Sequence, residues 1–271
     1  MVVIMVKVLG IEKPVIGMVH LRPLPNTPKY GGESIDELLD HALHEAKVLI
    51  EGGIDAILVE NFNDVPYELK PSDPIVVSVM TLIVNEIRKL GVPVGVNVLR
   101  NGCIEALAIA HTAKASFIRC NVFVETIVTD QGIIEPIAPK LMRYKRSLGA
   151  GVKVFADIHV KHGKPLIDRP IEEAALEAFD RGLADAVIVT GERTGIPPKM
   201  NVLRSVKSAV GDRPVIVGSG VNAENIGEIL SIADGVIVGT YLKKNGIVTN
   251  PVDVRRVKKI MRVANSVRTR H

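Results

Sequence analysis

One short pattern occurs three times in this chain and limits the folds that the chain can adopt. Residues 53–60, 183–190 and 232–239 each contain an aspartate that follows turn residues and precedes a run of apolar, mostly β-branched residues. Such a junction is typical of a helix that leads into a strand buried on both faces, as in parallel sheets. We therefore expect the chain to be built from repeated α/β units.

Other β-branched runs bring the number of expected strands to eight. The expected strands are 15–20, 56–61, 94–98, 116–121, 152–160, 186–190, 215–219 and 235–240. Amphipathic helices are expected at 35–51, 74–90, 172–181, 201–208, 223–231 and 252–267. The strands start roughly 20 to 40 residues apart, which is the length that a strand and its crossover helix require. In a chain of 271 residues, this pattern predicts the α/β class and a single-domain (β/α)8 TIM barrel over residues 1–271.

The composition is consistent with a large aliphatic core. Hydrophobic residues make up 47% of the chain and aromatic residues only 3%, so aliphatic packing must dominate. The single glutamine, Gln131, and the 34 Lys and Arg against 30 Asp and Glu suit a heat-stable protein.

Polar residues end several strands whose interiors are aliphatic, and long loops follow the first two strands. These residues are His20, Arg22, Glu60, Asn61, Asn97, Arg119 and Asn121. Turns that lead into strands are short, so the elaborated edge is the carboxyl end of the strands, where barrel enzymes place their active sites. Each residue taken alone could instead form a turn or bond loop backbone. Together they predict a mouth of mixed charge, with Glu60 and His20 as second-choice acid/base groups.

The fifth expected strand carries the first-choice catalytic group. Alternation along a strand would place Asp157, His159 and Lys161 on one side, facing the barrel mouth. The carboxylate could fix the imidazole tautomer, and the lysine could hold an oxyanion or act as a base. The alternative is a structural hydrogen bond for Asp157 and an exposed Lys161.

Two glycine turns near the end of the chain predict a phosphate site. They contain Gly218, Ser219, Gly220, Gly239 and Thr240, and each follows a β-branched run. Small residues let backbone N–H groups approach an anion closely, and Asn222 or Asn225 could cap the helix that follows. The alternative is that the glycines merely permit strand-to-helix turns.

The loop after the sixth expected strand is a candidate lid over this site. Its glycines could act as hinges that bring Arg193 or Thr194 to a phosphate, and Thr190 at the start of the loop is a further candidate substrate contact. A tight connection, with Pro197 and Pro198 opening the next helix, is the simpler alternative.

The charge and the cysteine content of the chain indicate which classes of binding partner and which cellular compartment to expect. The net charge is +4, with much of the excess in the last helix from Arg255 to Arg270. A solvated helix face is a better explanation than a nucleic-acid site, although peripheral membrane contact stays open. No apolar run reaches the about 20 residues of a membrane span, and the apolar start is too short for a secretion signal. We expect a cytoplasmic protein, with Cys103 and Cys120 reduced.

No metal or organic cofactor is expected. His20, Glu60, Asp157 and His159 are residue types that bind divalent metals, but no two of them have a recognised metal-site spacing.

The sequence also resembles a known family over nearly its whole length. Segments 17–25, 189–195, 218–221, 238–241 and 250–252 are similar to the BtpA/SgcQ family. The resemblance implies a TIM barrel of the ribulose-phosphate-binding type. It also implies one of two settings: a membrane-associated factor for photosystem I biogenesis, as in cyanobacteria, or sugar metabolism. It assigns no catalytic residue.

These observations predict an enzyme that acts on a small phosphorylated metabolite, such as a sugar phosphate, by acid/base proton transfer as an isomerase, epimerase or lyase. A homo-oligomer is expected. Two alternatives from other classes stay open: a non-catalytic, membrane-associated assembly factor, and a nucleoside or glycoside hydrolase.

Overall fold

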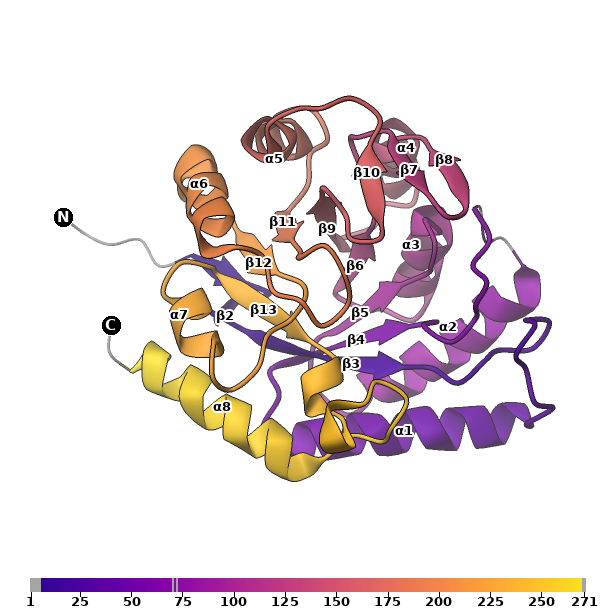
Figure 1. Ribbon diagram of the computed structural model, residues 1–271. Coiled ribbons are helices and arrows are strands. Elements are labelled where there is room, and N and C mark those ends of the chain that lie inside the picture. The colour runs from indigo at the N-terminus through magenta and orange to yellow at the C-terminus, as the bar shows by residue number, and fades with distance from the viewer. Residues whose placement is uncertain (1–5, 70, 72, 270–271) are drawn as a thin grey trace.

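Eight parallel strands form a closed barrel, which confirms the predicted fold (Figure 1). The computed structural model describes residues 6–69, 71 and 73–269. The barrel strands, in chain order, are β3 (Val15–His20), β4 (Ala56–Glu60), β5 (Val94–Asn97), β6 (Phe117–Cys120), β9 (Lys153–Ile158), β11 (Ala186–Val189), β12 (Val215–Val217) and β13 (Gly235–Val238). β13 pairs in parallel with β3 and closes the barrel.

Helices surround the strands, as Figure 1 shows. They are α1 (Ile35–Glu51), α2 (Pro74–Arg88), α3 (Cys103–Thr112), α4 (Ala138–Ser147), α5 (Ile171–Asp180), α6 (Met200–Val210), α7 (Ile226–Leu230) and α8 (Val254–Arg268), with 3-10 turns η1 (Thr240–Leu242) and η2 (Lys244–Gly246). The sequence did not predict α3 or α4. α3 is apolar over most of its surface, so it shows no clear amphipathic stripe. α4 has ten residues and is mostly polar, and its buried residues, Ala138 and Leu141, are too few to stand out in the sequence.

The repeated aspartates join neighbouring strands at the amino-terminal end of the barrel. Asp55 Oδ2 accepts a hydrogen bond from the Val15 N–H at 2.8 Å. Two equivalent bonds run from the Val154 N–H to Asp185 and from the Val215 N–H to Asp234, at 2.9 and 2.8 Å. Each aspartate also pairs with a cation, namely Arg268, Lys153 or Lys207. The aspartate in the repeated sequence pattern therefore has a structural role: it joins the turn before one strand to the start of the neighbouring strand.

Two small sheets were not predicted. β1 (Lys7–Val8) and β2 (Ile11–Glu12) form a hairpin, and Val8 packs inside the barrel with Ile16 and Met18. β7 (Ile127–Thr129), β8 (Gly132–Ile134) and β10 (Gly163–Pro165) form a three-stranded antiparallel sheet, drawn in magenta and red in Figure 1. Two- and three-residue strands are too short to leave an alternating pattern in the sequence.

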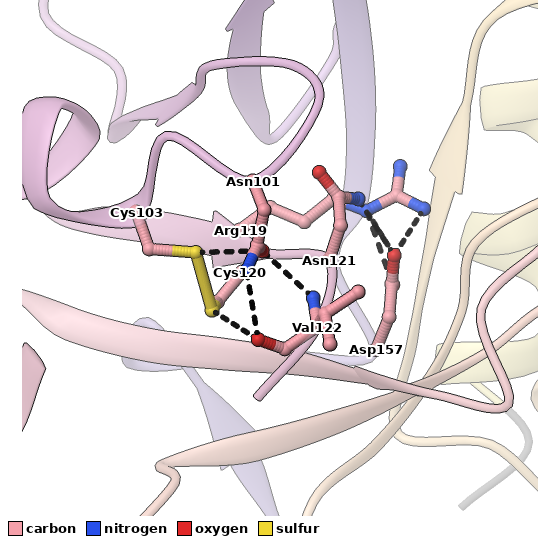
Figure 2. The surroundings of a disulfide bond; sticks show 7 residues. All are labelled: Asn101, Cys103, Arg119, Cys120, Asn121, Val122 and Asp157. Atoms are coloured by element: carbon pink, nitrogen blue, oxygen red, sulfur yellow. Dashed lines mark hydrogen bonds and ion pairs between the residues drawn. A yellow bond between two sulfur atoms is a disulfide. The ribbon is translucent and has the colours of Figure 1, made fainter. Parts of the chain in front are cut away.

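The prediction that the two cysteines are reduced was wrong, because Cys103 and Cys120 form a disulfide (Figure 2). Their Cα atoms lie 5.4 Å apart, within the range that a disulfide spans. Cys103 is the first residue of α3, and Cys120 is the last residue of β6, against which α3 packs. A separation of 17 residues does not reveal this contact until the register of helix and strand is known.

Three of the six basic residues of α8 pair with carboxylates elsewhere in the barrel. Lys258 binds Glu51, Lys259 binds Glu224, and Arg268 binds Asp55. These pairs do not favour α8 as a membrane-binding face. Within the described residues, no helix is both long and apolar enough to cross a bilayer.

Candidate active site

Two adjoining cavities open at the carboxyl ends of the barrel strands. The smaller has a volume of about 220 Å³ and the larger about 490 Å³. The two cavities share five lining residues, namely Glu60, Phe62, Arg119, Lys161 and Thr194. They are therefore two chambers of one site. We call the smaller cavity the anion chamber and the larger cavity the distal chamber.

The predicted glycine turns line the anion chamber. All five residues proposed from the sequence lie there: Gly218, Ser219, Gly220, Gly239 and Thr240. Within the described chain, the backbone N–H groups of Ser219, Gly220 and Val221 donate no hydrogen bond, so they are available to a ligand. Backbone N–H groups gathered in a turn form an anion-binding concavity.

The Ser219 hydroxyl forms two hydrogen bonds with the backbone of the loop after β11. It accepts a hydrogen bond from the Gly191 N–H at 2.7 Å and donates one to the Ile196 carbonyl at 2.9 Å. Ser219 therefore ties the loop after β11 to the turn after β12. The expected hydroxyl contact with phosphate is better assigned to Thr240.

The two asparagines expected to cap the next helix fold the turn that precedes α7. Asn222 Oδ1 accepts from the backbone N–H groups of Glu224 and Asn225, at 2.9 and 3.0 Å. Asn225 Oδ1 accepts from the Asn222 N–H at 2.8 Å, and its amide donates to the Gly220 carbonyl at 3.0 Å. The two side chains thus fix the glycine turn from behind.

Gly220 is required at its position by both space and backbone geometry. Its φ is +67°, and a Cβ built there would lie 2.0 Å from the Pro197 nitrogen. Gly211 offers a matched control, because its φ is +64° and nothing lies within 4 Å of its Cβ position.

We expect Gly211→Ala to lower the free energy of unfolding by about 1–2 kcal/mol through left-handed strain alone. Gly220→Ala is expected to lower it by about 1–3 kcal/mol more, because the added carbon collides with the loop. Urea denaturation of both variants measures the difference. Equal losses would show that the loop after β11 does not pack against Gly220.

Arg256 was missed by the sequence analysis, which treated the basic residues of α8 as solvated. Its side chain lines the anion chamber. The guanidinium lies over the Tyr241 ring, 4.3 Å from its centroid, and Nε donates to the Tyr241 carbonyl. The sequence position of Arg256 could have indicated this contact. Arg256 lies in the first turn of the helix that follows the eighth barrel strand, and such a turn lies near the carboxyl ends of the strands.

Glu60 is held at the junction of the two chambers. The buried Asn97 donates from Nδ2 to Glu60 Oε2 at 2.5 Å, and His20 Nε2 lies 3.8 Å from Oε1. His20 stacks on Phe62 with ring centroids 4.4 Å apart. Burial lowers the pKa of His20 well below its usual value, and the cations of Lys243, Lys161 and Arg119 lower it further. His20 is therefore a neutral neighbour of Glu60.

Lys161 projects into both chambers. Its backbone is fixed from two sides, since its N–H donates to Thr190 Oγ1 at 3.2 Å and its carbonyl accepts from Arg100 Nη2 at 2.7 Å. Burial, followed by the charge of Arg119, lowers the pKa of its ammonium to about 8. Part of the Lys161 population is thus a neutral amine near neutral pH.

Asp157 faces Arg119 and lines neither chamber. Arg119 Nε and Nη2 lie 3.0–3.2 Å from the Asp157 carboxylate, and Asn121 Nδ2 donates to it at 2.8 Å (Figure 2). The carboxylate side chain is fully buried. The structural alternative therefore describes Asp157 better than proton transfer does: it holds Arg119 at the wall of both chambers.

His159 turns away from the mouth, against the expectation of a shared face. Its φ is +44°, which ends the strand alternation just after Ile158. Its Nε2 lies 3.2 Å from Glu125 Oε1, and its backbone N–H donates to Glu125 Oε2 at 2.8 Å. His159 lines neither chamber.

Of the remaining residues predicted to contact substrate, one lines the chambers, one holds neighbouring loops together, and two lie outside the chambers. Thr194 lines both chambers, with Oγ1 3.0 Å from His162 Nε2. Asn61 is buried and accepts from the Leu99 N–H at 2.7 Å, so it fastens two loops together. Arg22 lines a separate cavity beside His41, and Arg193 is exposed and lines neither chamber.

The four residues considered as metal ligands are not brought together. Glu60 and His20 are neighbours, whereas Asp157 binds Arg119 and His159 contacts Glu125. In residues 6–69, 71 and 73–269, no three His, Cys, Asp or Glu side chains form a group of metal-site geometry.

Comparison with known proteins places the chain in a family. The model of the BtpA family matches residues 11–266. The photosystem I biogenesis protein BtpA of Synechocystis sp. is 45% identical, over 91% of this chain and 86% of that protein. An uncharacterised protein of Methanocaldococcus jannaschii is 46% identical, over 95% and 97% of the two chains.

Solved structures share the barrel at much lower identity. N-(5'-phosphoribosyl)anthranilate isomerase from Pyrococcus furiosus has a TM-score of 0.58 and 20% identity, covering 94% of this chain and 100% of that one. This likeness is one of fold. The sequence matches carry the assignment: the chain belongs to the BtpA family.

Proposed function

We propose that this protein is an enzyme that acts on a small phosphorylated metabolite, such as a sugar phosphate, by acid/base proton transfer. The reaction class is an isomerase, epimerase or lyase. One observation carries the proposal: a single site combines a glycine-lined anion chamber with a buried carboxylate and an amine at its junction with a second chamber.

The anion chamber supports a phosphoryl group as the anchored part of the ligand. The backbone N–H groups of Ser219, Gly220 and Val221, the Thr240 hydroxyl and the Arg256 guanidinium surround it. The titratable side chains at the junction are Glu60 and Lys161, so Glu60 is the proposed base. A metabolite held by its phosphate would place its carbon skeleton between them.

We do not propose the assembly-factor role for this chain. Three cations of α8 already face Glu51, Glu224 and Asp55, and Arg256 lines the anion chamber, so only part of the positive charge of this helix is available to an anionic surface.

Phosphate binding is the first test. Arg256→Met is expected to weaken binding of inorganic phosphate roughly 10-fold or more, because a charge-assisted hydrogen bond contributes about 1.5–3 kcal/mol. Arg262→Met is the matched control, since Arg262 is exposed on the same helix. Titration followed by the rise in Tm measures both affinities. Equal affinities in the two variants would remove Arg256 from the site.

Proton transfer is the second test. A set of sugar phosphates is incubated with the protein in D2O, and mass spectrometry follows deuterium entering carbon-bound positions. We expect exchange in at least one compound, dependent on the protein. Phosphate binding without any exchange would support a binding protein and contradict the enzyme.

A further inference from the structure

We propose that Lys161 is a nucleophile that forms an imine with a carbonyl group of the substrate, so the substrates are phosphorylated aldehydes or ketones. This inference rests on the proposed function and adds to it a covalent step and a substrate class. The geometry that carries it is the position of the amine where the two chambers meet.

The lysine side chain has no structural partner. Among the described residues, Nζ of Lys161 forms neither a hydrogen bond nor an ion pair, whereas the buried Lys243 pairs with Glu45. The backbone of Lys161, in contrast, is fixed by Thr190 and Arg100. A side chain on a fixed backbone with a free amine in a cavity is arranged to meet a ligand.

A second phosphate anchor is a less good explanation for Lys161. The anion chamber already contains Arg256 and the glycine turns. Burial, followed by the neighbouring Arg119, lowers its pKa to about 8, although Glu60 acts in the opposite direction. The lowered pKa increases the fraction of neutral amine near neutral pH, which a nucleophile needs and a pure phosphate anchor does not.

The covalent step balances without an external oxidant or reductant. The neutral Nζ attacks the carbonyl carbon, a C–N bond forms, and the C=O π pair moves to the oxygen, which takes a proton from the nitrogen to give a neutral carbinolamine. A second proton from solvent lets that oxygen leave as water, and the nitrogen lone pair forms the C=N bond of a protonated imine. Hydrolysis reverses the sequence and returns the free lysine.

The imine explains why an amine and a carboxylate occur together. A protonated imine withdraws electrons from the adjacent carbon, so a C–H bond there loses its proton more readily than in the free carbonyl compound. Glu60, which shares both chambers with Lys161, can accept that proton, and the electron pair passes to the imine nitrogen as an enamine. Return of the proton to the opposite face of the same carbon regenerates the imine with inverted configuration, and its hydrolysis completes an epimerisation.

Reductive trapping tests the proposal directly. The full-length protein is incubated with dihydroxyacetone phosphate, xylulose 5-phosphate or ribose 5-phosphate, then treated with sodium borohydride. Hydride reduces an imine to a stable secondary amine, which peptide mapping locates. We expect a single adduct on Lys161 with at least one probe, and no adduct in Lys161→Arg. Lys164→Arg is the control, because Lys164 is exposed three residues away.

The pH dependence gives a second readout. Only the neutral amine attacks, so the initial rate of adduct formation should rise with pH, with a midpoint near the Lys161 pKa of about 8. A midpoint near the ordinary lysine pKa of about 10.4 would contradict the buried position.

Glycerol 3-phosphate, which has no carbonyl group, separates the two proposals. If it raises the Tm but no carbonyl probe labels Lys161, the imine is overturned and the proposed function stands. If neither stabilisation nor labelling is seen, the proposed function itself fails. Labelling spread over exposed lysines, Lys164 included, would also overturn the imine.

Discussion

Replacing Glu60 with glutamine is expected to lower turnover of the phosphorylated substrate by about 10²–10⁴-fold, the usual contribution of a general base. Glutamine keeps the size of the side chain and an oxygen that can accept from Asn97, but it cannot take a proton. The free energy of unfolding should therefore change little. Rates of deuterium exchange and urea denaturation measure the two effects.

Glu173→Gln is the matched control for this prediction. Glu173 is an exposed carboxylate on α5, outside both chambers, and its replacement should leave exchange unchanged. Full exchange activity in Glu60→Gln would remove Glu60 as the base, whereas loss in both variants would indicate a general effect of charge.

The largest effect on stability is expected from Asp157→Ala. The variant leaves the buried Arg119 guanidinium without its carboxylate, and breaking a buried ion pair in this way lowers the free energy of unfolding by about 3–5 kcal/mol. Urea denaturation measures the loss. The double variant Arg119→Met/Asp157→Leu removes both charges and should recover much of it.

An exposed pair provides the comparison. Glu86, in the last turn of α2, pairs with Lys89, the residue that caps the carboxyl end of this helix, and their side chains are 33% and 55% exposed. Glu86→Ala should therefore change the free energy of unfolding by less than about 1 kcal/mol. A loss equally small in Asp157→Ala would mean that Arg119 reaches solvent or a second partner, and the positioning role of Asp157 would fail.

Much of the barrel could be predicted from local patterns. The bounds of β3 and α1 agree with the expected 15–20 and 35–51, because each is a continuous run set off by clear turn or cap residues. Ser34 and Glu37 form a capping box at the start of α1, which sets its first turn. The repeated aspartates predicted the junctions, although their bonds to neighbouring strands depend on pairing that no single segment encodes.

Only some of the residues predicted from the sequence line the site, and backbone geometry and tertiary contacts explain the difference. The glycine turns line the anion chamber at the rim, as their position directly after two barrel strands predicts. Of the three residues predicted from strand five, Lys161 lines both chambers, whereas Asp157 and His159 line neither. A positive φ at His159 breaks the assumed alternation, and Asp157 pairs with Arg119 on the adjacent strand. Arg256 enters from a helix distant in sequence, so its contact with the chamber depended on the tertiary fold.

A crystal structure grown with inorganic phosphate tests the central claim most directly. We predict a phosphate ion in the anion chamber, with its oxygens within hydrogen-bond distance of the backbone N–H groups of Ser219, Gly220 and Val221 and of the Arg256 guanidinium. Glu60 and Lys161 should line the space beside it. An anion bound elsewhere, with this chamber empty at a saturating phosphate concentration, would contradict the account.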